Sequence, residues 1–324
     1  MNKTTDVNAV IERHFPSSAH LLTEFMCEEQ SQIFRFPHCL VFRGEASANT
    51  YTLLPSALRL ECHERIHQLA CYSGLIFNEI TAICLEADYI MAENAIMSYF
   101  YRTANEQGLK LPPIPSQWHQ HLLNRENFLT KNREWIPHEL AGLLALMQHY
   151  KLPTRMLDWS KNILVALYFA ASGAAKHLEN DSGKTDDNMV IWILRTNDFT
   201  PGILPPHNAL NIKLVTPTYA DNPNLYAQKG VMSYIPITRS EYYKAIDRRP
   251  LDEQIRSSYS NEKLYYPILV KATIPVQNAS HTLKMLDSLG INASTIYPGY
   301  GSVYQKMMED QFTNRDWHSI ISRG

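Results

Sequence analysis

Two apolar helical patterns flank a polar segment near the middle of the chain, and they limit how this region can fold. The first pattern is Leu140, Leu143, Leu144 and Met147, whose spacing places one buried stripe along a helix. Pro153 lacks an amide hydrogen and disfavours helical geometry in the residue before it, so this helix should end ahead of it. A rigid, buried helix is therefore expected to hold the first end of the polar segment.

A second buried helix is expected after the polar segment. Residues 163–171 are almost entirely apolar and include alanines that allow close packing. Asp158 and Ser160 both have side chains suited to the N-cap of that helix. We therefore predict that residues 147–160 form a loop held at both ends by rigid elements, which is where binding and catalytic residues usually lie.

The composition is that of a globular protein, with 45% hydrophobic and 19% charged residues. A formal charge of −2 gives no overall attraction to nucleic acid or anionic lipid, and the mixed charges of residues 239–256 predict a solvated helix face. The five cysteines show no C-x-x-C spacing, which is typical of free thiols in a reducing cytoplasm. No segment is apolar enough for a signal peptide or a membrane span, so we expect a cytoplasmic protein without a membrane partner.

Helical patterns dominate the first half of the chain and strand patterns the second. Helices are predicted over 75–107 and 282–289, and strands over 40–42, 189–194, 214–217, 231–237 and 267–274. This order predicts an α+β fold in which a helical N-terminal half packs on a mostly C-terminal, largely antiparallel sheet.

The first candidate site lies where the strand over 40–42 ends. Arg43 would place a permanently charged, forked donor at the end of a buried strand, and Gly44 would let the backbone approach a ligand closely. Phosphate or diphosphate is the natural ligand of such a group. An equal alternative is that Arg43 forms a structural ion pair with Glu45 or Asp158.

The second and third candidate sites are the polar segment and a later turn. His149 could act as a base or a hydrogen-bond donor, and Trp159 could stack on a nucleobase or a nicotinamide ring. The alternative is that Asp158 caps the following helix and Trp159 fills the core. Gln228, two residues before Gly230, could orient a hydroxyl or an amide, although an ordinary turn would look the same.

A short zinc-like motif also occurs. His63, Glu64 and His67 match H-E-x-x-H, which on a helix puts two imidazoles on one face with Glu64 as a base, and Glu86 could be a third ligand. Arg65 stands between the two histidines, however, and a cation beside the ligands of a dication is electrostatically unfavourable. We therefore expect no metal, and a zinc hydrolase is the least favoured hypothesis.

Four segments carry a resemblance to a known family: FRG at 42–44, YTLLPSALR at 51–59, LMQHYKLPTRMLDWS at 146–160 and NPNLYAQKGVM at 222–232. In this order they resemble the FRG domain, a family named for its Phe-Arg-Gly motif. The resemblance implies an α+β fold, a bacterial source and a role as a toxin or phage-defence effector. It predicts an N-terminal helical extension over 1–36, an FRG domain over 37–305 and a C-terminal tail over 306–324.

A looser similarity points to ADP-ribosyltransferases, which implies a core of that type and NAD as the substrate. The similarity is in the order of three parts: Arg43, then residues 154–160, then Gln228. Arg43 would hold the NAD diphosphate, Trp159 or Tyr51 would flank nicotinamide, and His149 or Gln228 would position the ribose. The reaction would be ADP-ribosyl transfer to a protein or nucleic-acid acceptor, or NAD hydrolysis, and a partner protein could neutralise it.

These hypotheses give a defined set of site residues. The expected nucleotide-binding residues are Arg43, Gly44, Tyr51, Ser56, Arg59, Gln148, Thr154, Arg155 and Trp159. The expected catalytic residues are Glu45, His149, Asp158 and Gln228. No Q-x-E or E-x-E motif stands near Gln228 to supply the glutamate of the third part. A non-catalytic module that senses a nucleotide or binds a partner protein is therefore the main alternative.

Overall fold

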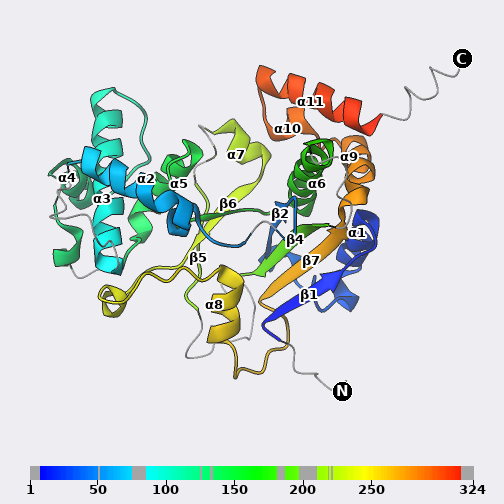
Figure 1. Ribbon diagram of the computed structural model, residues 1–324, viewed down its shortest axis with the longest axis horizontal. Coiled ribbons are helices and arrows are strands. Elements are labelled where there is room, and N and C mark those ends of the chain that lie inside the picture. Colours follow the sequence, from blue (N-terminus) through cyan, green and yellow to red (C-terminus); the bar gives the residue numbers. More distant parts are fainter. Residues whose placement is uncertain are drawn as a thin grey trace, which may run out of the picture.

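A seven-stranded sheet runs through the centre of the molecule, with helices on both of its faces (Figure 1). The computed structural model describes residues 8–49, 52–74, 85–124, 126–131, 134–180, 187–196, 210–217, 219 and 222–314. The strand order is β1-β7-β4-β2-β3-β6-β5, with β1 and β7 parallel and all other neighbouring pairs antiparallel. The expected α+β class is confirmed.

The strands come from the whole length of the chain. They are β1 (Val10–His14), β2 (Leu40–Glu45), β3 (Leu157–Ser160), β4 (Asn188–Arg195), β5 (Lys213–Val215), β6 (Gly230–Tyr234) and β7 (Leu269–Pro275). All five predicted strands occur, with ends shifted by a few residues. The sequence pattern missed β1, where only one residue is buried, and β3, which is only four residues long.

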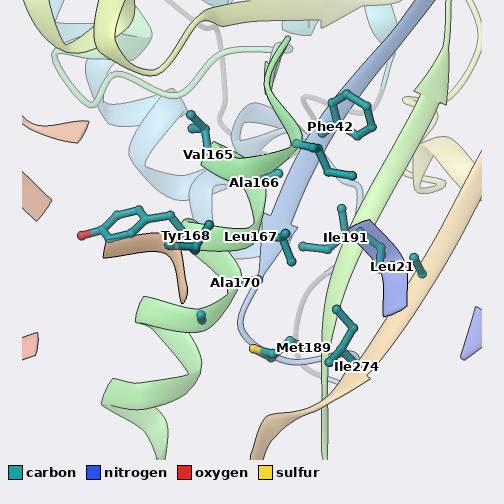
Figure 2. Close-up of a cluster of buried hydrophobic side chains, with 14 of the residues drawn as sticks. Leu21, Phe42, Val165, Ala166, Leu167, Tyr168, Ala170, Met189, Ile191 and Ile274 are labelled. Carbon is teal, nitrogen blue, oxygen red and sulfur yellow. The ribbon is translucent and has the colours of Figure 1, made fainter. Parts of the chain in front are cut away.

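One face of the sheet is covered by α6 (Ile163–Asn180), α9 (Ala279–Ser288) and α1 (Ser18–Met26). Figure 2 shows Phe42 and Ile191 of the sheet facing Leu167 of α6 in this core. The contact is so close at Gly44 that an added Cβ would lie 1.8 Å from the carbonyl oxygen of Ala166. Gly44 therefore lets α6 approach β2, a structural role that differs from the expected approach to a ligand.

A separate helical group packs beside β6, at the left of Figure 1. It contains α2 (Leu60–Tyr72), α3 (Glu86–Glu106), α4 (Ser116–Asn124) and α5 (Ala141–His149). The predicted helix over 75–107 corresponds to α3 from residue 86 onwards, and residues 75–84 lie outside the described part of the chain. A third core lies between the sheet and α8 (Leu251–Ser258), on the face opposite α6.

The remaining helices lie after β5 in the sequence: the short α7 (Pro223–Ala227) and α10 (Ala293–Ile296), and the longer α11 (Tyr300–Thr313). The expected N-terminal extension contains β1, which is paired with β7 in the sheet. The expected C-terminal tail begins inside α11. Among the described helices, none is long and apolar enough to span a membrane.

The predicted loop over 147–160 is partly wrong, because its last four residues form β3 between β2 and β6. The predicted cap of the next helix is also wrong. The amide of Leu164 donates to Asn162 Oδ1 at 2.9 Å, and Ser160 Oγ instead accepts from the amide of Asn162 at 3.0 Å. Pairing on both edges of β3 keeps Asp158 and Ser160 in the sheet and moves the helix start to Asn162.

Candidate functional site

A cavity of about 530 Å³ lies on the α8 side of the sheet, where the helical group meets the third core. Its volume falls within the range of about 300–1,000 Å³ that is common for small-molecule sites. Apolar walls come from the segment before α2, from β3, from the end of β6 and from α8. The residues that form them include Leu53, Leu58, Leu157, Ile235, Ile237 and Leu251. This cavity is the best candidate for a binding site among the described residues.

The other walls of the cavity carry charged and polar groups. Lys244 is exposed at the rim, and no ion pair to it is found in the described chain. Arg249 and Asp247 also line the cavity, and they pair with each other at 2.6 Å. Glu241 caps the short helix that precedes them through Thr238. Among the described residues, Lys244 is therefore a rim cation without an ion pair.

Arg155 is a deeply buried charged group of the cavity wall, with a side chain that is only 4% exposed. Its Nε lies 2.9 Å from Glu93 Oε2, and its Nη1 lies 2.8 Å from Glu86 Oε2. Its Nη2 has no hydrogen-bond partner in the described structure. A buried donor without a partner costs on the order of 1–3 kcal/mol. Arg155 thus combines a place in the cavity wall with a buried donor that has no partner among the described residues.

Burial and the carboxylates of Glu93 and Glu86 have opposite effects on the pKa of Arg155. Burial disfavours the charged guanidinium, but Glu93 and Glu86 outweigh it, so the pKa of Arg155 is raised. Burial also raises the pKa of Glu93, against the opposing effects of Arg155 and of the Trp135 indole N–H, which donates to Glu93 Oε2 at 2.7 Å. Arg155 is therefore a fixed positive charge at the cavity wall.

The buried ring of Tyr89 packs against Arg155. The guanidinium of Arg155 lies 5.2 Å from the centre of the Tyr89 ring, and that of Arg248 lies 5.7 Å from it. His63 stacks on the same ring at 6.0 Å, and its Nδ1 is 3.1 Å from Arg248 Nη2. Burial and the charge of Arg248 lower the pKa of His63. His63 therefore belongs to the packing around Tyr89.

The H-E-x-x-H motif lies on α2, as a helical motif should. His67 is 3.9 Å from the thiol of Cys71, one turn further along the helix. Among the residues that the structure describes, no group of three or more His, Cys, Asp or Glu side chains could hold a metal ion. Nothing in the described geometry favours the zinc hypothesis.

Arg43 does not line the cavity. Its Nε lies 2.6 Å from Glu45 Oε1, and its Nη1 donates to the backbone carbonyl of Asp158 at 2.9 Å. The ion pair with Glu45 is the structural alternative that the sequence left open, whereas the contact with Asp158 uses the backbone and leaves its side chain exposed. Arg43, Glu45 and Asp158 thus hold β2 and β3 together.

The polar segment forms a hydrogen-bonded chain of its own. The hydroxyl of Thr154 donates to Gln148 Oε1, and the amide of Thr154 donates to Ser56 Oγ at 3.2 Å. Arg59 Nε donates to the carbonyl of Leu54 at 3.0 Å. His149 is exposed at the end of α5. These contacts fix the path of the chain from α5 to β3. None of these residues lines the cavity, although Arg155, the neighbour of Thr154, does.

Trp159 and Gln228 are also engaged in packing. The buried Trp159 donates its indole N–H to Ser233 Oγ at 2.7 Å, and Ser233 lines the cavity. Trp159 therefore lies behind the cavity wall and cannot stack on a ligand there. Gln228 Nε2 donates to the carbonyl of Ile296 at 3.3 Å. Tyr51 lies outside the described residues.

Of the predicted site residues that the structure describes, only Arg155 lines the cavity. The sequence reasoning missed Lys244, Asp247 and Arg249 as cavity residues, because mixed charges normally indicate a solvated face. The sequence suggested Glu86 only as a metal ligand. Glu86 begins α3, and its Oε1 accepts from the amide of Asp247 at 3.1 Å.

The three sequence motifs do come together in the sheet. Arg43 lies on β2, the LDWS end of the second motif forms β3, and Gln228 stands two residues before β6. These strands are direct neighbours in the order β2-β3-β6. Both Leu157 of β3 and Ser233 of β6 line the cavity. The motifs therefore build the sheet floor under the cavity rather than its contact surface.

Comparison with known proteins gives one match. The family model described as FRG domain matches residues 38–179, from just before β2 to the end of α6. The match confirms the resemblance and includes Glu86 and Arg155, whereas the rim around Lys244 lies beyond it. No curated protein and no solved structure matches the chain.

Proposed function

We propose that this FRG-domain protein binds a nucleotide in the cavity beside Arg155, with NAD as the first candidate. The observation that carries the proposal is the buried guanidinium of Arg155, which lines a cavity of about 530 Å³ while its Nη2 has no partner in the described chain. Phosphate oxygens are strong acceptors for such a donor.

The cavity offers distinct surfaces for the parts of a nucleotide. The apolar side chains of Leu53, Ile235 and Leu251 suit a heterocyclic ring. Lys244 at the rim and Arg155 at the wall are cations for phosphate groups. Glu86 can accept hydrogen bonds from ribose hydroxyls. This division of apolar and charged walls supports a nucleotide over a purely apolar ligand.

ADP-ribosyl transfer or NAD hydrolysis is the second candidate function. The arrangement of Arg43, the LDWS segment and Gln228 on or beside three adjacent strands supports it. The carboxylates that line the cavity, however, are Glu86, Glu241 and Asp247, and not the expected Glu45 or Asp158. A catalytic function would therefore use a cavity carboxylate. The acceptor, a neutralising partner and a toxin or phage-defence role stay predictions.

Binding is tested by calorimetry with NAD, ADP-ribose and ATP on paired variants of α8. Ser258 lines the cavity, whereas the adjacent Ser257 is exposed and does not. We expect Ser258→Trp to abolish binding, because an indole would occupy the cavity, and Ser257→Trp to bind like the wild type. Absence of binding by the wild type to all three compounds, or equal binding by both variants, would contradict the proposal.

The role of Lys244 is tested by charge reversal. We expect Lys244→Glu to weaken binding at least about tenfold, because a phosphate would then face a carboxylate. Lys284→Glu is the matched control, since Lys284 is exposed on α9, away from the cavity. Release of nicotinamide when the wild type is incubated with NAD would indicate an enzyme, whereas binding of NAD without this release would indicate a sensor.

A further inference from the structure

The last described helix, α11, packs on the molecule through its polar side. The hydroxyl of Tyr168 donates to Glu309 Oε1 at 2.5 Å, and Gln305 Nε2 donates to the same hydroxyl at 3.1 Å. Lys306 lies 3.4 Å from Asp287 of α9. Glu309 and Lys306 therefore attach α11 to α6 and α9, above which α11 lies in Figure 1.

The apolar side of α11 faces solvent. Tyr300 is 97% exposed, Tyr304 68%, Met307 64%, Val303 52% and Met308 38%. These five residues follow the i, i+3, i+4, i+7, i+8 spacing of one helix face, and we call them the α11 stripe. Such a stripe normally faces a protein core. In α11 the stripe faces solvent instead, and an exposed apolar surface of this kind is typical of a site that binds a partner.

None of the five residues of the α11 stripe is charged, and the half-exposed Asp310 beside the stripe pairs with Lys306 of the same helix. The other exposed residues of α11 beside the stripe are Gly301 and Gln311, and Asn314 follows as the cap. Nucleic acids and anionic membranes are bound through lysines and arginines, which the stripe lacks. An uncharged protein surface rich in apolar groups is the matching partner.

We propose that the partner is a second copy of this chain, and that two α11 helices pack antiparallel across a twofold axis. A twofold interface places the same surface against itself, so charges of one sign would repel each other across it. The α11 stripe has none. Its Tyr304 and Met307, near the middle of the helix, would meet their counterparts closest to the axis.

The exposed area is sufficient for a dimer of modest affinity. With about 200 Å² for a whole tyrosine side chain, the α11 stripe exposes on the order of 600 Å² in each copy. Two copies would bury about 1,200 Å², which is at the lower end of the range for specific interfaces. The dimer should therefore dissociate on dilution.

The test is sedimentation velocity over a concentration series with charged variants of Tyr304. We expect the wild type to show a dimer at high concentration, and Tyr304→Glu and Tyr304→Lys each to raise the dissociation constant at least about tenfold through like-charge repulsion. An equimolar mixture of the two variants should recover the dimer. Tyr72→Lys is the control, because Tyr72 is 86% exposed on α2 in the helical group.

Each opposite result would overturn the proposal. A wild type that stays monomeric at the highest concentration has no such interface. Persistence of the dimer in both Tyr304 variants, or its loss in Tyr72→Lys, would place the interface elsewhere. Two variants that stay monomeric when mixed would show that Tyr304 does not face its counterpart. Circular dichroism and thermal unfolding confirm that each variant is folded.

Discussion

The guanidinium of Arg155 and the carboxylate of Glu93 form a buried ion pair in which Nε lies 3.0 and 2.9 Å from the two carboxylate oxygens. The two residues are 62 positions apart in the chain, and they join the segment before β3 to α3. Arg155 thus stabilises the junction between the sheet and the helical group and also lines the cavity.

Replacement of Arg155 by leucine should strongly destabilise the fold. It would leave the carboxylates of Glu93 and Glu86 buried without a cation, and the loss of one partner of a buried pair costs about 3–5 kcal/mol. Urea unfolding measures the change. The control is Arg249→Leu, which breaks a pair whose arginine side chain is 52% exposed and should cost about 1 kcal/mol or less. Equal losses for the two variants would contradict this account.

Acidification should destabilise the protein through His63. Burial and Arg248 lower the pKa of His63, so below pH 6.5 the unfolded chain binds a proton there more readily than the folded chain does. Stability is therefore lost as the pH falls from 6.5 toward the lowered pKa. We expect His63→Gln to reduce this loss, measured as the change in melting temperature between pH 7.5 and pH 5.5, conditions that bracket the unperturbed value of about 6.5. The exposed His149→Gln is the matched control, and an equal reduction of the loss in both variants would contradict this account.

Substitution of Gly44 by alanine should destabilise the fold by at least about 1–3 kcal/mol, because the new methyl would meet the backbone of α6. Gly142→Ala is the matched control. An added Cβ there has only an ordinary contact of 3.7 Å with Pro112, and alanine favours the helix by about 1 kcal/mol. Chemical denaturation should therefore show opposite signs for the two variants. A tolerated Gly44→Ala would mean that α6 can move away from β2.

Trp159→Phe should lower stability without changing nucleotide affinity. It removes the hydrogen bond to Ser233 and leaves a gap in the third core, with an expected cost of about 1–3 kcal/mol. Calorimetric titration with NAD should give the wild-type dissociation constant, since the indole lies behind the cavity wall. A large loss of affinity with unchanged stability would instead support the stacking role suggested by the sequence.

Local sequence patterns located much of the fold but little of the candidate site. The strand β4 and the helix α6 have long apolar runs, so their positions were predicted closely. The strand β3 has four residues, and its pairing with β2 and β6 depends on segments far away in the sequence. Periodicity reports only local geometry, so such a strand looks like a loop.

The amino-acid sequence by itself determined the α+β class and the FRG resemblance, and it supplied the candidate side chains of residues 147–160. Only the tertiary structure decided which of those side chains bond to other parts of the fold and which line the cavity. The physical reason is that the hydrogen bonds of a polar group are made by its neighbours in space. Arg43 pairs with Glu45, two residues away, whereas Arg155 pairs with Glu86 and Glu93 on a helix that is distant in the sequence, and its Nη2 has no partner among the described residues.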